Sequence, residues 1–422
     1  MNKLYIVMGQ LTEVGGWQLY INNKIRYMRQ EKWVAIALAS LSYSSSVDDI
    51  KLDYLKKYGF YDFKEFMLLP SYFDEKNLMI IIKKINDILF ELSPEGFDEI
   101  VVESTSINYA PWGEYIASQL NGRHLFFSVH SHYGRISDSE LAFFEYKYRR
   151  NELYGILENS LKEMFKDYLN IPESDKHVLV APCRTAMIDD GVDYSVKLNF
   201  SDYHYIIGSL AQLQKGYILP MVKQIVNFAK NYDKRILLIF IGSSNGEIIE
   251  RRILETINDC QNVHPKFCGS LSEIPKNLVV KFDLCVASFG SATVSSLCGA
   301  KTLCMTDDCD QPLGMIGYDL IEKPYHAKYK PNSSIFEYLT EFLVNKTYEN
   351  KVFTPTIDIY DENKYFERHL VALKMMDSSK CYYDITKTKG SLLRYFIHKS
   401  LIYLIGFENV YKIKYLIRKI IK

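Results

Sequence analysis

The sequence lacks the features that mark several classes of protein. It has no CxxC pair and no cluster of histidine and cysteine at zinc-ligand spacing, so we predict no metal site. Its eight cysteines all lie from Cys183 onward, several of them in apolar segments, which is typical of buried, reduced thiols. No window of eighteen residues is uninterruptedly apolar, so no membrane-spanning helix is expected.

Neither sign of charge is in excess. Lys and Arg together number 51, as do Asp and Glu, and this balance argues against nucleic acid as the main partner. The first residues, MNKLYIVMG, read directly as a strand and lack the charged and then apolar pattern of a secretory leader. These features predict a cytoplasmic globular protein, and the length of 422 residues predicts two domains.

Short apolar segments alternate with longer mixed segments along most of the chain. In the first half we expect strands at 4–8, 34–38, 98–102 and 124–129, and helices at 16–29, 77–92, 111–120 and most of 138–168. In the second half we expect strands at 178–181, 203–207, 235–241, 263–267, 284–287 and 302–305. Strands that alternate with helices indicate parallel sheets covered on both faces.

The polar, proline-bearing segment 170–176 predicts a domain boundary. We therefore predict an α/β protein with two Rossmann-like parallel-sheet domains facing each other across a cleft. The expected ranges are 1–172 for the first domain, 173–375 for the second and 376–422 for a helical, basic tail.

The segment 285–304, CVASFGSATVSSLCGAKTLC, is the most informative part of the chain. It reads as a buried strand, a loop at 288–293, a short helix and another buried strand. Small residues let a ligand approach the backbone, and hydroxyl and N–H groups can hold an anion. A tight turn in any Rossmann-like domain has the same character. The candidate ligand-binding residues here are Ser288, Gly290, Ser291, Ala292 and Thr293.

Two other positions in the second half are candidates for binding an anion. Lys215 opens an expected helix, where its charge and the helix dipole can act together on a phosphate, although a lysine at a helix start is commonly just solvated. Gly242 and Ser243 begin a second small-residue loop at a strand end, which fits close approach to a nucleotide or a simple turn.

In the first half, candidates follow three expected strands. Gly15 and Gly16 precede the first helix, and Glu103 ends a strand, where it can contact a sugar hydroxyl or cap the next helix. His130 directly follows the strand HLFFSV and can act as a general base or bind a phosphate or hydroxyl; the plainer alternative is a surface-loop histidine.

The order of these segments over about residues 1–320 resembles the GT-B fold glycosyltransferases, in particular retaining enzymes of bacterial surface-polysaccharide (capsule and O-antigen) pathways. The matching positions are the Gly15-Gly16 loop, the VH at His130, the KG at Lys215, the glycine loop at Gly242 and the final SATVSS motif. The resemblance implies transfer of a sugar from a nucleotide-diphosphate sugar to a glycan or lipid-linked acceptor hydroxyl.

The resemblance also implies the roles of the residues. His130 would be catalytic, Gly15, Gly16 and Glu103 would bind the acceptor, and Lys215 with the small-residue loops would bind the donor diphosphate. The nucleotide sugar would be a co-substrate, and no tightly bound cofactor is implied.

The sequence departs from the family pattern at three places. Ser209 stands where the family has an arginine. Many members have two glutamates eight positions apart in the last motif; here Ser288-Phe289-Gly290 replaces the surroundings of the first, and Ser296 replaces the second. These departures favour an alternative, a non-catalytic GT-B-like subunit that binds a glycan or a partner enzyme. A nucleotide-sugar epimerase is a third candidate.

The tail at 387–422 contains nine Lys and Arg residues and one acidic residue, Glu408, interleaved with aromatic and aliphatic residues. This basic amphipathic pattern suits an anionic membrane surface. We therefore expect peripheral contact with the inner face of the cell membrane. The alternative is a helix that packs on the domains with a solvated basic face.

Overall fold

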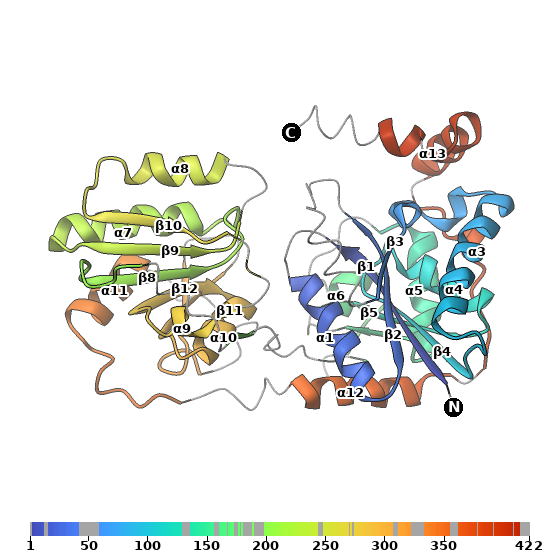
Figure 1. The fold of residues 1–422 in the computed structure, drawn as a ribbon, viewed down its shortest axis with the longest axis horizontal. Helices are drawn as coiled ribbons and strands as arrows, with labels where there is room; N and C mark the ends of the chain where they lie inside the picture. The colour runs from blue at the N-terminus through green and yellow to red at the C-terminus, as the bar shows by residue number, and fades with distance from the viewer. Residues whose placement is uncertain are drawn as a thin grey trace. The chain divides into compact units, whose positions relative to one another are not determined.

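The computed structural model describes residues 2–11, 16–41, 59–128, 136–155, 160–166, 168–172, 176–177, 179, 188–189, 198–243, 248–269, 271, 274–306, 311–321, 333–354, 362–377, 379–390, 392–407 and 409–413. The chain divides into two compact units. Unit 1 comprises residues 1–181 and 363–422, and unit 2 comprises residues 182–362. Each unit is built on a six-stranded sheet (Figure 1).

The sheet of unit 1 is parallel throughout, in the order β3-β2-β1-β4-β5-β6. Its strands are β1 (Lys3–Leu11), β2 (Val34–Leu41), β3 (Phe60–Asp62), β4 (Glu99–Ser104), β5 (Arg123–Ser128) and β6 (Leu153–Gly155). The helices of this unit are α1 (Gly16–Gln30), α3 (Glu75–Leu92), α4 (Ala110–Gln119), α5 (Asp138–Arg149), α6 (Ser160–Phe165), α12 (Glu362–Met375) and α13 (Leu392–Ile405). Short 3-10 turns lie at Lys64–Met67, Pro70–Tyr72 and Ile385–Lys387.

Successive residues of β1 pack alternately into the cores on the two faces of this sheet. Tyr5 and Val7 join the cluster that includes α1 and α12, whereas Leu4, Ile6 and Met8 join the cluster that includes α3 and α4. This alternation is the side-chain pattern of a strand covered on both faces. It explains why β1 is apolar almost throughout.

The sheet of unit 2 has the order β10-β9-β8-β12-β13-β14, and only the edge strand β14 is antiparallel. Its strands are β8 (Tyr205–Leu210), β9 (Ile236–Ile241), β10 (Val263–Phe267), β12 (Leu284–Ser288), β13 (Thr302–Met305) and β14 (Pro312–Met315). A separate two-stranded sheet pairs β7 (Ile188–Asp189) with β11 (Ile274–Pro275).

Helices again cover both faces of this second sheet. The clusters that pack on one face include α7 (Ile218–Tyr232), α8 (Ile248–Ile257) and α11 (Ile335–Leu339), which continues as a π-helical turn at Thr340–Val344. The clusters on the other face include α9 (Lys276–Val279) and α10 (Phe289–Leu297). The predicted α/β class with two Rossmann-like domains is confirmed.

The chain passes from one unit to the other twice, and both boundaries differ from the predicted domain boundaries. The first boundary lies between residues 181 and 182, where we expected it between 172 and 173. Helix α12, which we placed in the second domain, belongs to unit 1, because Phe366, Leu373 and Met376 are buried in the same core cluster as Tyr5. Unit 1 is therefore assembled from both ends of the chain.

Two details of the secondary structure were not expected. Most of the stretch 138–168 is helical as predicted, in α5 and α6, but β6 lies between these helices and pairs with Phe126–Ser128 at the edge of the sheet. Asn151 adopts a left-handed conformation (φ 54°), which turns the chain after α5 and allows this strand to form. The antiparallel strand β14 was not predicted either.

Candidate functional site

Each sheet contains a point where the direction of strand addition reverses. In unit 2 the chain passes from β8 to β9 and β10 on one side and then places β12 on the other side of β8. In unit 1 the same happens between β1 and β4. Ligands of open α/β sheets bind beyond the carboxyl ends of strands at such points. The two pairs β8/β12 and β1/β4 therefore define where each unit is suited to hold a ligand.

At the β8/β12 point the structure brings two predicted residues together. The ammonium group of Lys215, which follows β8, donates a hydrogen bond of 2.7 Å to the hydroxyl oxygen of Ser288, the last residue of β12. Lys215 is partly exposed, whereas Ser288 is buried. A cation is therefore fixed beside the strand end while part of its surface still faces solvent.

Helix α10 starts at the same place. Ser288 is its N-cap residue and Phe289 its first residue, and no side-chain hydrogen bond from Ser288 caps the helix. The predicted loop at 288–293 is therefore wrong: Phe289 adopts a left-handed conformation (φ 40°) and turns the chain from strand to helix without a loop. The positive end of the helix dipole consequently lies next to Lys215, an arrangement suited to a phosphate group.

The remaining residues of the predicted loop lie within the first turns of α10. Gly290 and Ser291 are partly exposed there. Ala292 is fully buried against the core, so it can reach a ligand only through its backbone. The hydroxyl of Thr293 donates to the carbonyl oxygen of Phe289 at 3.1 Å, which turns it back along the helix. Gly290 and Ser291 are thus better placed than Thr293 to contact an anion.

Gly242 and Ser243 follow β9, the strand next to β8. Gly242 has φ +145° and forms an isolated bridge with Gly269, and Ser243 accepts a hydrogen bond from the backbone N–H of Leu213. A Cβ atom on Gly242 would lie 1.8 Å from the carbonyl oxygen of Ala211. Packing alone therefore requires glycine here, independently of any ligand.

Ser209, which stands at the family's arginine position, is a buried residue of β8. Its hydroxyl has no hydrogen-bond partner among the residues that the structure describes. A short, enclosed side chain does not replace the charge and reach of a guanidinium group. Lys215 is accordingly the cation that the described part of this strand end supplies.

In unit 1, Glu103 near the carboxyl end of β4 lies inside a buried polar cluster. Its carboxylate accepts hydrogen bonds from the hydroxyl groups of Tyr5 and Tyr20, the latter at 2.6 Å, and forms an ion pair of 3.3 Å with the ammonium group of Lys24. Burial and the neighbouring Glu103 charge both raise the pKa of Tyr5 well above its ordinary value. Both carboxylate oxygens thus serve this cluster, and an acceptor sugar would reach Glu103 only if the cluster opened.

The same cluster holds helix α12, which follows unit 2 in the sequence, against the rest of unit 1. Lys24 approaches the Nδ1 atom of His369 at 2.7 Å, and both side chains are fully buried. Burial lowers the pKa of Lys24 to about 8, against the opposing effect of Glu103, and burial together with the Lys24 charge lowers the pKa of His369 well below its ordinary value. Neutral His369 therefore accepts from the lysine ammonium.

Two of the predicted residues cannot be placed. Gly15 and His130 lie outside the described residues, and the acceptor-binding and catalytic roles given to them stay predictions. Gly16 begins α1 after β1, which places it beside the β1/β4 point. Within the described ranges, no histidine, cysteine, aspartate and glutamate side chains gather into a group that could hold a metal ion.

Phe289 is the residue of this site that sequence reasoning missed. Its positive φ (40°) turns the chain from β12 directly into α10, so the helix starts beside Ser288, which accepts the hydrogen bond from Lys215. The signal was present as a Ser-Phe-Gly sequence directly after a buried strand, but a non-glycine residue in this conformation is uncommon and was not expected.

The two-unit α/β architecture is that of the GT-B fold. Similar crystal structures include Anabaena HepE in complex with UDP and glucose, with a TM-score of 0.54 and 14% identity over 89% of this chain and 95% of that one. The HepE complex with UDP-glucose gives a TM-score of 0.52 and 13% identity over the same shares. A glycosyltransferase from Rickettsia africae gives 0.51 and 12%, over 95% and 99%. No protein-family model and no curated protein matches the sequence.

Proposed function

We propose that the protein is a glycosyltransferase that transfers a sugar from a nucleotide-diphosphate sugar to a hydroxyl group of a glycan or lipid-linked acceptor. The observation that carries the proposal is the hydrogen bond from Lys215 to Ser288 at the β8/β12 point, beside the N-terminus of α10. Crystal structures with the same fold hold UDP or UDP-glucose, which supports a nucleotide sugar as the co-substrate.

The proposed chemistry needs negative charge to be neutralised where the bond to the sugar breaks. As the glycosidic bond to the diphosphate breaks, charge builds up on the leaving phosphate oxygen, and a nearby cation and helix N-terminus stabilise that charge. Lys215 and the start of α10 would supply both. His130 remains the proposed catalytic residue, and Gly15, Gly16 and Glu103 the proposed acceptor-binding residues.

The experiment is a thermal shift against UDP, UDP-glucose, GDP-mannose and CMP-sialic acid. A ligand at 100 times its dissociation constant stabilises a fold by about 2.7 kcal/mol, so a bound nucleotide should raise the melting temperature. Lys215→Met should weaken that binding roughly ten- to a hundredfold, since a hydrogen bond to a charged group contributes about 1.5–3 kcal/mol. Lys223→Met, which removes an exposed lysine of α7, is the matched control and should bind as the wild type does.

If none of these nucleotides moves the melting curve, the alternative of a non-catalytic subunit that binds a glycan or a partner enzyme becomes the better proposal. If a nucleotide binds but Lys215→Met and Lys223→Met behave alike, the donor site lies elsewhere. Release of UDP from UDP-glucose, followed over time, then separates a transferase or slow hydrolase from a subunit that only binds.

We infer that contact with an anionic membrane accompanies this activity. Of the helices whose residues the structure describes, none has the length and apolar character needed to cross a bilayer. Helix α13 docks on unit 1 through Ile402, which is buried, and through ring contacts of Tyr395 and His398 with Tyr72. Its opposite side exposes large apolar side chains, including Leu393, Phe396, Tyr403 and Leu404.

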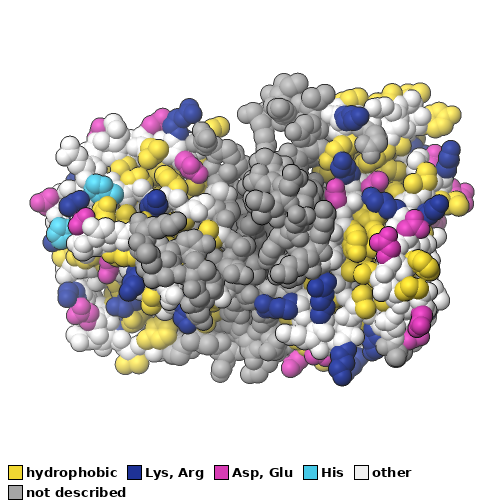
Figure 2. Space-filling model, viewed as in Figure 1, with side chains coloured by type: hydrophobic (Ala, Val, Ile, Leu, Met, Phe, Trp, Pro, Cys, Tyr) yellow, Lys and Arg dark blue, Asp and Glu magenta, His cyan; other side chains and the backbone are white. Residues whose placement is uncertain are grey.

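The helix that carries these exposed apolar residues also carries an exposed cation. Lys399 is exposed on the same helix, and Figure 2 shows hydrophobic and basic side chains together at the upper right, where α13 lies in Figure 1. Tyr403 and Leu404 are 85% and 72% exposed. Exposure of such large apolar side chains to water is unfavourable in free energy. A helix with an exposed apolar face and an exposed cation fits the surface of an anionic leaflet.

A flotation assay with vesicles of phosphatidylglycerol and phosphatidylcholine tests this contact. Phe396→Ser combined with Leu404→Ser should lose roughly 3 kcal/mol of binding free energy or more, because each large apolar side chain contributes about 1.5–3 kcal/mol when buried. The control is the double variant Ile248→Ser with Val352→Ser, which removes two exposed apolar side chains of unit 2. It should float with the vesicles as the wild type does. Equal flotation of both double variants would reject the membrane contact. Truncation is a poorer test, since Ile402 and Val410 belong to the core of unit 1.

A further inference from the structure

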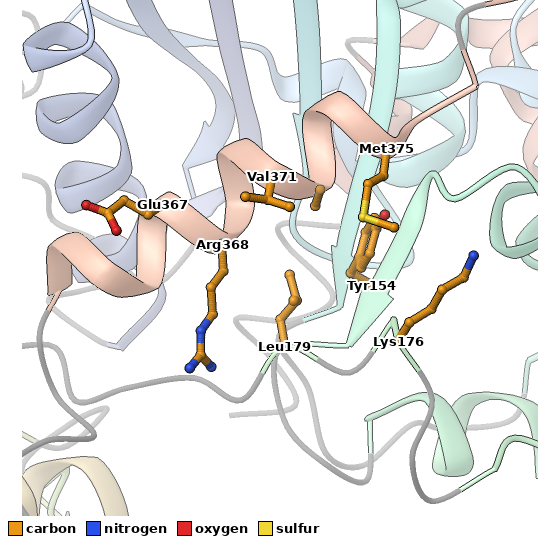
Figure 3. Close-up of a pocket in the computed structure, with 8 residues that line it drawn as sticks. Tyr154, Lys176, Leu179, Glu367, Arg368, Val371 and Met375 are labelled. Atoms are coloured by element: carbon orange, nitrogen blue, oxygen red, sulfur yellow. The ribbon is translucent and has the colours of Figure 1, made fainter.

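A cavity of about 530 Å³ lies within unit 1, between helix α12, strand β6 and residues Lys176 and Leu179 (Figure 3). Its position at β6, the edge strand, separates it from the β1/β4 point, because β5 lies between β4 and β6. Small-molecule sites typically have volumes of about 300–1,000 Å³. The cavity is therefore large enough for a ligand of moderate size.

The floor of the cavity is apolar. Val371, Ala372 and Met375 lie on one side of α12 at helical spacing, and Leu179 and the ring of Tyr154 complete the lining. Val371 and Met375 are 53% and 47% exposed, although valine and methionine at such positions on a docked helix are usually covered. An apolar ligand body would remove these side chains from water.

Two cations stand at the borders of this floor. Figure 3 shows Arg368 and Lys176 on opposite sides of Leu179 and Tyr154, while Glu367 points away from both. Arg368 and Lys176 are exposed. The charge beside the apolar floor is thus positive, which favours an anionic group on the ligand over a cationic one.

Tyr154 lines the cavity with its ring, whereas its hydroxyl is enclosed. It is 2% exposed, and its hydroxyl has no hydrogen-bond partner among the described residues. Burial, with a smaller contribution from the charge of Glu152, raises the pKa of Tyr154 to about 12, so the hydroxyl keeps its proton at neutral pH. This oxygen has almost no accessible surface, so a ligand in the cavity would contact the ring of Tyr154 and not its hydroxyl.

We propose that this cavity is a second ligand site, which takes a compact molecule with an apolar body and one anionic group, such as a phosphate or a carboxylate. The apolar body would lie on Leu179, Val371 and Met375. The anionic group would pair with Arg368 or Lys176. This inference does not depend on the proposed transferase activity.

The test is isothermal titration of the full chain with octyl phosphate below its micelle concentration. We expect saturable binding to one site, and binding at least about tenfold weaker for octylammonium and for inorganic phosphate, because each lacks half of the recognised chemistry. Arg368→Gln and Val371→Glu should each weaken octyl phosphate about tenfold. Absence of saturable binding, or equal binding of octylammonium, would overturn the proposal.

Matched controls separate this site from the others. Lys374→Gln removes an exposed lysine of α12 outside the cavity, and Val352→Glu places an acid at an exposed apolar position of unit 2. Both should bind octyl phosphate as the wild type does, and so should Lys215→Met in the presence or absence of UDP. Losses as large in these controls as in Arg368→Gln would show that the alkyl phosphate binds elsewhere and would overturn the assignment.

Discussion

Gly242 shows how a single position in a candidate site can be fixed by packing alone. Its φ of +145° is rare for residues with a side chain, and an added Cβ atom would overlap the carbonyl oxygen of Ala211. The backbone carbonyl cannot rotate away as a flexible side chain can. Glycine after β9 is therefore explained by the β9–β8 connection before any ligand is considered.

Gly242→Ala should consequently lower the free energy of unfolding by about 2 kcal/mol or more. Gly269→Ala is the matched control, since Gly269 also has a positive φ (+69°) but has no atom within 4 Å of an added Cβ. Gly269→Ala should lower the free energy of unfolding only by the cost of placing alanine in the left-handed conformation, about 1–2 kcal/mol. Urea denaturation of both variants measures the difference, and equal losses would show that the Ala211 contact relaxes at no cost.

At the scale of elements, a buried ionic network joins α4, α5, β5 and the residue that precedes β6 in unit 1. The ammonium group of Lys147 lies 2.7 Å from the carboxylate of Glu114 and 2.6 Å from that of Glu152, and Nδ1 of His124 lies 3.0 Å from Glu114. Glu114 also accepts a hydrogen bond from the backbone N–H of Tyr383. One carboxylate thereby connects α4 to the segment that follows α12.

This network should make unit 1 sensitive to acid. Burial raises the pKa of Glu114, but Lys147 and His124 outweigh it and lower the pKa to about 2, so stability that is present above pH 4.5 is lost as the pH falls toward 2. Burial, reinforced by Lys147, lowers the pKa of His124 to about 4, so the unfolded chain takes up a proton first and stability falls between pH 6.5 and 4. Glu114 and His124 therefore both lower the stability of unit 1 as the pH falls.

Urea midpoints at pH 7, 5.5 and 4.5 should therefore decrease in that order. In His124→Gln the decrease between pH 6.5 and 4 should become smaller, because the titrating imidazole is absent. His204→Gln, at an exposed histidine of unit 2, should keep the wild-type dependence. A midpoint that stays constant from pH 7 to 4.5 would contradict the role given to His124.

At the scale of the whole molecule, local sequence patterns predicted most strands and helices but not how the distant parts assemble. Buried parallel strands such as β9, ILLIFI, are apolar throughout and are recognisable alone. Strand β6 has only three residues, and its pairing with β5 depends on the turn at Asn151. The place of α12 depends on contacts such as Lys24 with His369, which are 345 residues apart.

The candidate site was predictable in its residues but not in its geometry. Ser288 was expected at a strand end and Lys215 at a helix start, because small and charged residues stand out against apolar strands. Their hydrogen bond joins positions 73 residues apart and depends on the order of strands in the sheet. Glu103 shows the converse: its strand-end position was correct, but the buried neighbours Tyr5, Tyr20 and Lys24 could not be inferred from spacing.

The return of α12 to unit 1 has a consequence for biosynthesis. Unit 2 occupies one continuous stretch, 182–362, whereas the core of unit 1 needs Phe366, Leu373 and Met376. On the ribosome, the later-made unit 2 can thus complete its fold first, while the earlier-made unit 1 keeps part of its core uncovered and Lys24 without His369. The nascent N-terminal half therefore has to remain unaggregated until the segment from Phe366 to Met376 has been translated.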